Sequence, residues 1–142
     1  MPDNVVTIRG GQQVGNHVVT FTDYVVAALT TGNAKKEWII PFYCRIIDVI
    51  VTTEGTGGVG TDNTILDVNR NGTTIYTDQD NRPAKRPDDT GQWRYNAAGL
   101  ADRGYPDIVS LLPGDVLSYD IDQINATSGA TRTVVSIVCE AQ

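Results

Sequence analysis

The stretch TILDVNRNGTTIYT, residues 64–77, most constrains the fold, because apolar and polar residues alternate along it around a central Asn-Gly pair. Asn-Gly favours a type I′ turn, which joins two antiparallel strands through two residues. The turn predicts three cross-strand pairs: Arg70–Thr73, Val68–Ile75 and Leu66–Thr77. Val68 and Ile75 then lie together on the core face. The opposite face is expected to be exposed or to lie in an interface, and its residues are Asp67, Asn69, Thr74 and Tyr76.

The rest of the chain repeats this kind of pattern. Short runs rich in β-branched and aromatic residues are separated by Gly and Pro, and no run keeps a helical period. Many short strands with such turns predict an all-β sandwich or barrel. The length of 142 residues suits one domain, which we place at residues 17–142, after an extended arm at residues 1–16. The polar stretch 78–107 is expected to be a functional or interface loop.

Residues 44–53, CRIIDVIVTT, are expected to form one strand with apolar residues on both faces. Strict alternation places Ile47, Val49 and Val51 on one face. The other face then contains Cys44, Ile46, Asp48 and Ile50. A strand with one solvated face would show polar residues there, so this strand is expected to be covered on both sides. Another subunit is a possible source of the second cover.

The chain offers little for catalysis or for binding a cofactor. Its one histidine, His17, lies beside the expected arm, whereas a hydrolytic triad needs a base next to a nucleophile. Asp120 and Asp122 share the outward face of an expected strand, where a weak calcium site is the alternative to simple solvation. The two cysteines, Cys44 and Cys139, are expected to be buried thiols rather than a disulfide. We therefore expect no enzyme, no cofactor and no metal site.

Charge and hydropathy argue against two further kinds of partner. The net charge of −6 would repel a phosphate backbone, so no nucleic acid partner is expected. The stretch NRPAKRPDDTGQWRY, residues 81–95, gathers basic and aromatic residues, but we interpret it as a solvated loop whose aspartates offset the charge. No run is apolar and long enough for a membrane helix, and residues 1–11 lack a signal-peptide pattern. We expect no membrane partner and synthesis in the cytosol.

Three phrases together resemble a jelly-roll module of tailed bacteriophages: EWIIPFYCRIIDV, the hairpin ILDVNRNGTTIYT followed by NRP, and PDIVSLLPGDVLSYDIDQI. The resemblance spans residues 37–139 and lies in phrase and order rather than in a catalytic signature. Such modules recur in head-decoration (cement) proteins and in some head-fibre or tail receptor-binding proteins. The resemblance implies a jelly-roll β-sandwich that associates as a homotrimer.

On this resemblance, the expected function is capsid decoration. The trimer would be made in the cytoplasm of a host bacterium and would bind the major capsid protein on the outer surface of the virion. The arm supplies the candidate capsid contacts, which are Val5, Val6, Ile8 and Arg9. The candidate trimer interface consists of Ile46, Asp48 and Ile50.

The alternative expectation is a receptor- or glycan-binding module of a head fibre or tail. In that case, aromatic rings from the long polar loop would stack on sugar, and they are Trp93, Tyr95 and Tyr105. The other interpretation of the same rings is that they cap the core or the trimer contact.

Overall fold

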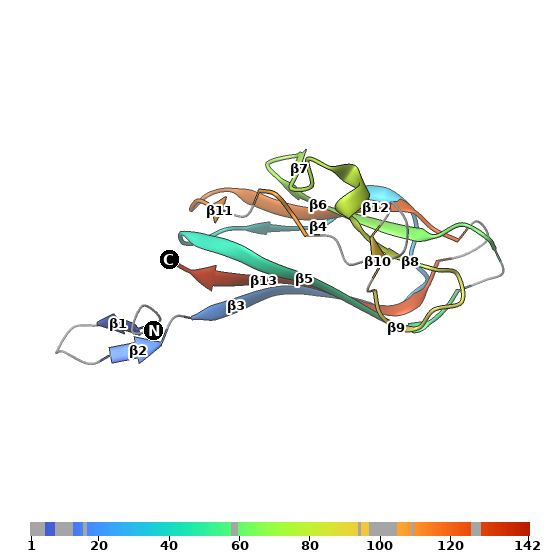
Figure 1. Ribbon diagram of the computed structural model, residues 1–142, viewed down its shortest axis with the longest axis horizontal. Coiled ribbons are helices and arrows are strands. Elements are labelled where there is room, and N and C mark those ends of the chain that lie inside the picture. The colour runs from blue at the N-terminus through green and yellow to red at the C-terminus, as the bar shows by residue number, and fades with distance from the viewer. Residues whose placement is uncertain are drawn as a thin grey trace.

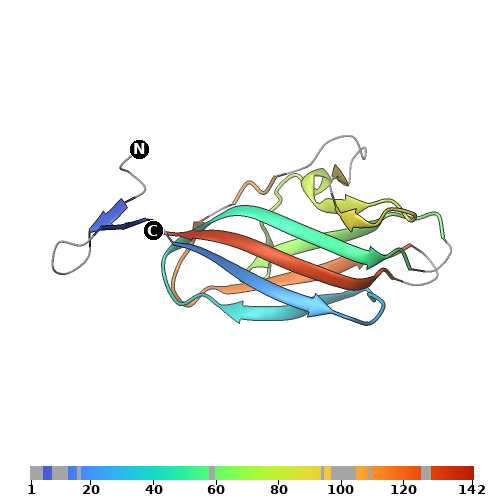
Figure 2. The same cartoon turned by 90° about the horizontal axis from the view of Figure 1, so that it is seen from below.

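The computed structural model describes residues 5–7, 13–15, 17–57, 60–93, 95–96, 105–108, 110–125 and 129–142. For residues 5–7, 13–15 and 95–96 it describes the backbone alone. Two antiparallel sheets pack face to face and confirm the predicted all-β sandwich (Figures 1 and 2).

The first sheet is five-stranded and has β13 near its centre. Its order is β11 (Ser110–Leu111), β5 (Cys44–Gly55), β13 (Thr131–Ala141) and β3 (Val18–Val25), and β9 (Gly91–Gln92) also pairs with β5. The second sheet is six-stranded. Its order is β10 (Tyr95–Asn96), β8 (Pro83–Lys85), β6 (Thr64–Arg70), β12 (Val116–Gln123) and β4 (Gly32–Ile39), and β7 (Thr73–Thr74) also pairs with β6.

The core lies between the two sheets and is filled by alternate residues of their longest strands. In β12 the core residues are Leu117, Tyr119 and Ile121, as the alternation of that stretch predicts. In β13 they are Val135, Ile137 and Cys139, each 0% exposed. Period-two burial on facing strands is how two sheets share one core. The core therefore depends on the registers of these two strands.

The hairpin at Asn71-Gly72 forms largely as predicted. Asn71 and Gly72 have φ values of 51° and 80°, which suit a type I′ turn, and Arg70 pairs with Thr73. The backbone N–H of Ile75 donates to the carbonyl of Val68 at 2.9 Å. The hairpin therefore confirms the first two predicted pairs.

The third predicted pair, Leu66 with Thr77, is wrong because β7 ends at Thr74. The chain then leaves the ladder, turns through the 3-10 helix η2 (Gln79–Asn81), and β8 takes the place beside β6, where Ile65 pairs with Ala84. The predicted exposure of that face is also wrong for Asp67, Asn69 and Tyr76, which are 6%, 7% and 1% exposed. Local alternation does not anticipate a segment that folds back over its own strand.

Strict alternation also fails in β5. The register with β13 pairs Asp48 with Val138 and Ile46 with Cys139, so one extra residue of β5 forms a bulge. Ile46 and Val49 are consequently both buried in the core, at 2% and 5% exposure, whereas Ile47 is 43% exposed. The prediction that Ile46 shares a face with Ile50 is wrong. The extra residue in the bulge turns these two side chains to opposite sides of the strand.

The described part of the N-terminal segment contains two short paired strands. β1 (Val5–Thr7) pairs with β2 (Gln13–Gly15), with Val6 opposite Val14. This ribbon lies apart from the sandwich, beyond the end where β3 begins (Figures 1 and 2). Val5 and Val6 are in β1, while Ile8 and Arg9 lie outside the described residues.

Both cysteines are free and buried, as predicted. Burial raises the pKa of the Cys139 thiol to about 12, and burial also raises the pKa of the Cys44 thiol. A thiol reacts as its thiolate, so both should be inert in the folded protein.

We expect Ellman's reagent at pH 8 to label neither cysteine of the native protein and both cysteines once urea has unfolded it. Thr61→Cys, at an exposed position of the loop before β6, serves as the control and should react at once in the folded protein. Rapid labelling of the native wild type would contradict the buried placement of the thiols.

Candidate interaction surfaces

The outer face of the first sheet has an almost uncharged centre. Figure 2 looks onto this sheet, with β13 between β5 and β3. Ser136 of β13 lies between Ile50 and Thr22, and its hydroxyl is 3.4 Å from that of Thr22. The next rows add Val138, which lies between Thr20 and Asp48, and Val134, which lies between Thr52 and Tyr24. We call the eight uncharged residues of these rows, from β3, β5 and β13, the neutral face.

Charged residues lie mainly at the two ends of the neutral face. Arg45 and Glu140 form an ion pair of 3.8 Å at one end, and Arg132 and Glu54 form one of 3.2 Å at the other. Such exposed pairs add little to stability. Each end nevertheless carries opposite charges side by side. Asp48, at the bulge, is the carboxylate nearest the centre, and its Oδ1 accepts from the backbone N–H of Val49 at 2.8 Å.

A hollow of about 460 Å³ lies at the Arg132 end of the neutral face. Tyr24, Thr52, Glu54, Arg132 and Val134 contribute to its lining. Tyr24 is 55% exposed, so one aromatic side chain stands in solvent beside an ion pair.

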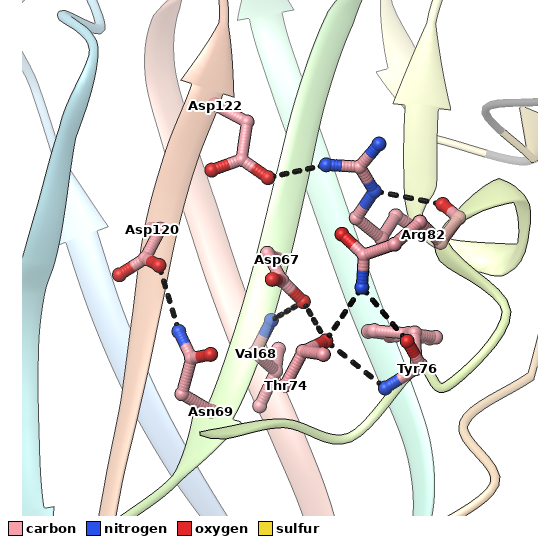
Figure 3. A network of polar contacts seen from close by, with 9 residues as sticks. Asp67, Val68, Asn69, Thr74, Tyr76, Arg82, Asp120 and Asp122 are labelled. Atoms are coloured by element: carbon pink, nitrogen blue, oxygen red, sulfur yellow. Dashed lines mark hydrogen bonds and ion pairs between the residues drawn. The ribbon is translucent and has the colours of Figure 1, made fainter. Parts of the chain in front are cut away.

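The outer face of the second sheet is polar instead. The Asp67 Oδ1 atom accepts from the Thr74 hydroxyl at 2.6 Å and from the backbone N–H of Val68 at 2.8 Å (Figure 3). Burial raises the pKa of Asp67, and the bond from Thr74 opposes that rise. Side-chain hydrogen bonds between β6 and the segment that follows it therefore stabilise this face.

Asp120 and Asp122 lie on the same outer face but have different partners. Asp120 Oδ2 accepts from Asn69 Nδ2 at 2.8 Å, and its Oδ1 accepts from the backbone N–H of Ala34 at 2.7 Å. Asp122 forms an ion pair of 2.6 Å with Arg82 (Figure 3). The two carboxylates are therefore each held by separate partners.

A groove of about 620 Å³ crosses this polar face between β4, β12 and the Asn71-Gly72 turn. Its polar lining consists of Asn33, Glu37, Asn69, Asn71, Ser118 and Asp120. We call it the polar groove. Neither lysine nor arginine lines it among the described residues.

The structure separates the residues that the sequence singled out for sugar binding. Trp93 is a core residue, 3% exposed, and its Nε1 donates to Thr53 Oγ1 at 3.1 Å. The capping interpretation is therefore the right one for Trp93. Tyr105 is 62% exposed, and Tyr95 belongs to β10, where only its backbone is described.

Of the candidate interface residues, only Asp48 and Ile50 reach the outer face of the first sheet, because Ile46 is in the core. The sequence did not lead us to predict that Tyr24, Val134 and Ser136 belong to a candidate interface. The available signal was the alternation in VVTFTDYV, residues 18–25, whose outward residues are Val18, Thr20, Thr22 and Tyr24.

The basic stretch around residue 85 is not the solvated loop that the sequence predicted. Lys85 is 1% exposed, its Nζ donates to the carbonyl of Arg86 at 2.8 Å, and burial lowers its pKa. Arg82 is held by Asp122. Lys85 and Arg82 therefore both form contacts within the folded chain.

Comparison with protein families, curated proteins and solved structures finds no match to this chain. Within the part of the chain that the structure describes, no group of His, Cys, Asp and Glu could hold a metal ion. No helix among the described residues is long and apolar enough to span a membrane.

We expect Asp67→Asn to gain stability over the wild type as pH rises above the ordinary aspartate pKa of 3.8. The raised pKa means that the native state holds this proton more tightly than the unfolded state, so ionisation costs the native state. Asparagine keeps the Oδ1 acceptor without the charge. Asp67→Ala should instead lower the free energy of unfolding by about 1–3 kcal/mol, because two donors lose their acceptor.

Urea unfolding of these variants between pH 3.5 and pH 7 measures the effect, and Asp62→Asn, at an exposed position, is the control. A stability difference between Asp67→Asn and the wild type that stays constant with pH would contradict the burial of an ionised Asp67.

Proposed function

We propose that this protein is a capsid decoration protein of a tailed bacteriophage, which binds the outside of the expanded capsid and bridges major capsid protein subunits. The observation that carries the proposal is the neutral face. It is a broad, mainly uncharged surface on a sandwich in whose described residues no group of His, Cys, Asp and Glu could hold a metal ion.

The strand order supports a jelly roll. Successive strands alternate between the sheets, since β3 and β5 belong to the first and β4 and β6 to the second. The early strands pair with the last ones, as β3 does with β13 and β4 with β12. This is the wrapping that the resemblance implies.

The neutral face suits the contact between the copies of a homotrimer. A chain with a net charge of −6 repels its own copies wherever they meet through carboxylates. On the neutral face the end charges are already paired within the chain, and the centre offers Ile50, Val134 and Val138. Interfaces commonly combine such an uncharged centre with a charged rim.

The N-terminal segment would supply the attachment to the shell. It projects from the sandwich and includes Val5 and Val6, whose backbone is in a strand and can extend another sheet. One short segment binds weakly, but three on one trimer raise the effective concentration and strengthen binding by roughly 10² to 10⁴. Trimers that bind only the expanded lattice stabilise it by mass action.

A receptor- or glycan-binding role is the second candidate function, favoured by one observation. The exposed ring of Tyr24 stands in a hollow beside the Arg132–Glu54 ion pair, where a sugar ring can stack and form hydrogen bonds. A glycan array that yields a binder sensitive to Tyr24→Ala, together with no capsid binding, would favour this role over decoration.

We expect deletion of residues 1–12 to abolish co-sedimentation with expanded capsids, because it removes β1 while leaving the sandwich intact. The full chain should sediment with expanded capsids and not with unexpanded ones. Matched thermal unfolding of both proteins is the control for folding. Capsid binding by the truncated chain at full strength would remove the arm from the mechanism.

We expect Ser136→Arg to shift the protein from trimer to monomer in sedimentation-velocity or light-scattering measurements. A charge at the centre of the neutral face would be desolvated at the contact. Thr73→Arg, at an exposed position of β7 on the second sheet, is the matched control and should leave the mass unchanged. A wild-type monomer, or a Ser136→Arg trimer, would contradict this use of the face.

A further inference from the structure

We propose that the polar groove binds the guanidinium group of an arginine side chain on a partner polypeptide. The inference goes beyond the proposed function, since it concerns the outer face of the second sheet and requires no capsid. It rests on unused hydrogen-bonding groups, on the charge of the groove and on its shape.

The first observation is that two buried polar groups in the groove have hydrogen-bonding capacity to spare. Ser118 is 6% exposed, and no described residue forms a hydrogen bond with its hydroxyl. Asn69 is 7% exposed and donates its amide to Asp120, but none of the described residues donates to its Oδ1. Both side chains line the groove, so their spare acceptors are open to a ligand that donates hydrogen bonds.

The second observation is the arrangement of these groups in a row. Ser118 of β12 pairs with Glu37 of β4 on one side and with Asn69 of β6 on the other. Side chains directly opposite on neighbouring strands are about 5 Å apart, so the three acceptors form a line across the groove. Asp120 stands beside this line and is held in place by Asn69 and by the backbone N–H of Ala34.

The third observation is charge. Glu37 and Asp120 both line the groove, and none of the described lysines and arginines does. Lys35, close by on β4, is occupied because its Nζ donates to Thr30 Oγ1 at 2.8 Å. The groove therefore repels anions. Among the described residues no aromatic side chain lines it, so it lacks the stacking surface that a sugar would use.

These features together select a cationic ligand with several donors. The carboxylates and Asn69 Oδ1 can only accept, and Ser118 can do either, so the ligand must mainly donate. A guanidinium presents five N–H donors in a planar fork, which suits acceptors spread along a line, whereas an ammonium concentrates three donors at one point.

The test is a titration of the full chain with N-acetyl-arginine amide, followed by ¹⁵N-resolved NMR. We expect saturable shifts in the millimolar range at the backbone amides of Asn33, Glu37 and Ser118. N-acetyl-citrulline amide, which has a similar shape without the charge, should not produce them. Glu37→Gln should weaken the affinity about three- to fivefold, the effect of one exposed charge pair.

Glu54→Gln, on the outer face of the first sheet, is the matched control and should leave the affinity unchanged. Shifts that do not saturate by tens of millimolar, equal shifts with citrulline, or no effect of Glu37→Gln would each overturn the proposal. The same shifts with Ca²⁺ alone would make the groove a general cation site and would overturn it as well. Since no capsid is present, failure here leaves the decoration proposal untouched.

Discussion

The pairing of β13 with both β5 and β3 is the interaction on which the rest of the structure depends. It joins the last strand of the chain to two early ones and so closes the first sheet. It also determines which residues face the core, because a strand shifted by one residue would turn every side chain over. The bulge in β5 is part of this register, and it brings Ile46 and Val49 into the core together while Ile47 points out.

The two outer faces of the sandwich differ in chemistry, and the difference follows from what covers each one. Among the described residues no segment covers the centre of the first sheet, and the outward residues of this sheet are mainly valine, threonine, serine and isoleucine. The second sheet is partly covered by the segment around η2, whose contacts bury Asp67. One sandwich thus presents a surface suited to protein contact and a surface that organises polar groups.

More of the fold than of the candidate site could be predicted from the sequence. Alternation and turn residues predict the sheets, the Asn71-Gly72 turn and the core residues of β12 and β13 correctly, because these are local signals with period two. The residues of the two candidate surfaces were harder to predict, since a neutral outward face and a polar groove are made by neighbours far apart in sequence. Ser118 and Glu37 share the groove only because β12 pairs with β4.

The sequence by itself determined that the chain forms β-strands, where its tightest turn lies and that its thiols are buried. Only the tertiary structure decided which side of β5 faces the core, because a bulge appears only in the pairing of two strands. It also decided that Asp67 and Tyr76 are buried, because that burial comes from a segment folding over β6 after β7 ends. The physical reason is the same in both cases: a residue's own pattern specifies its strand, while its exposure depends on what lies against that strand.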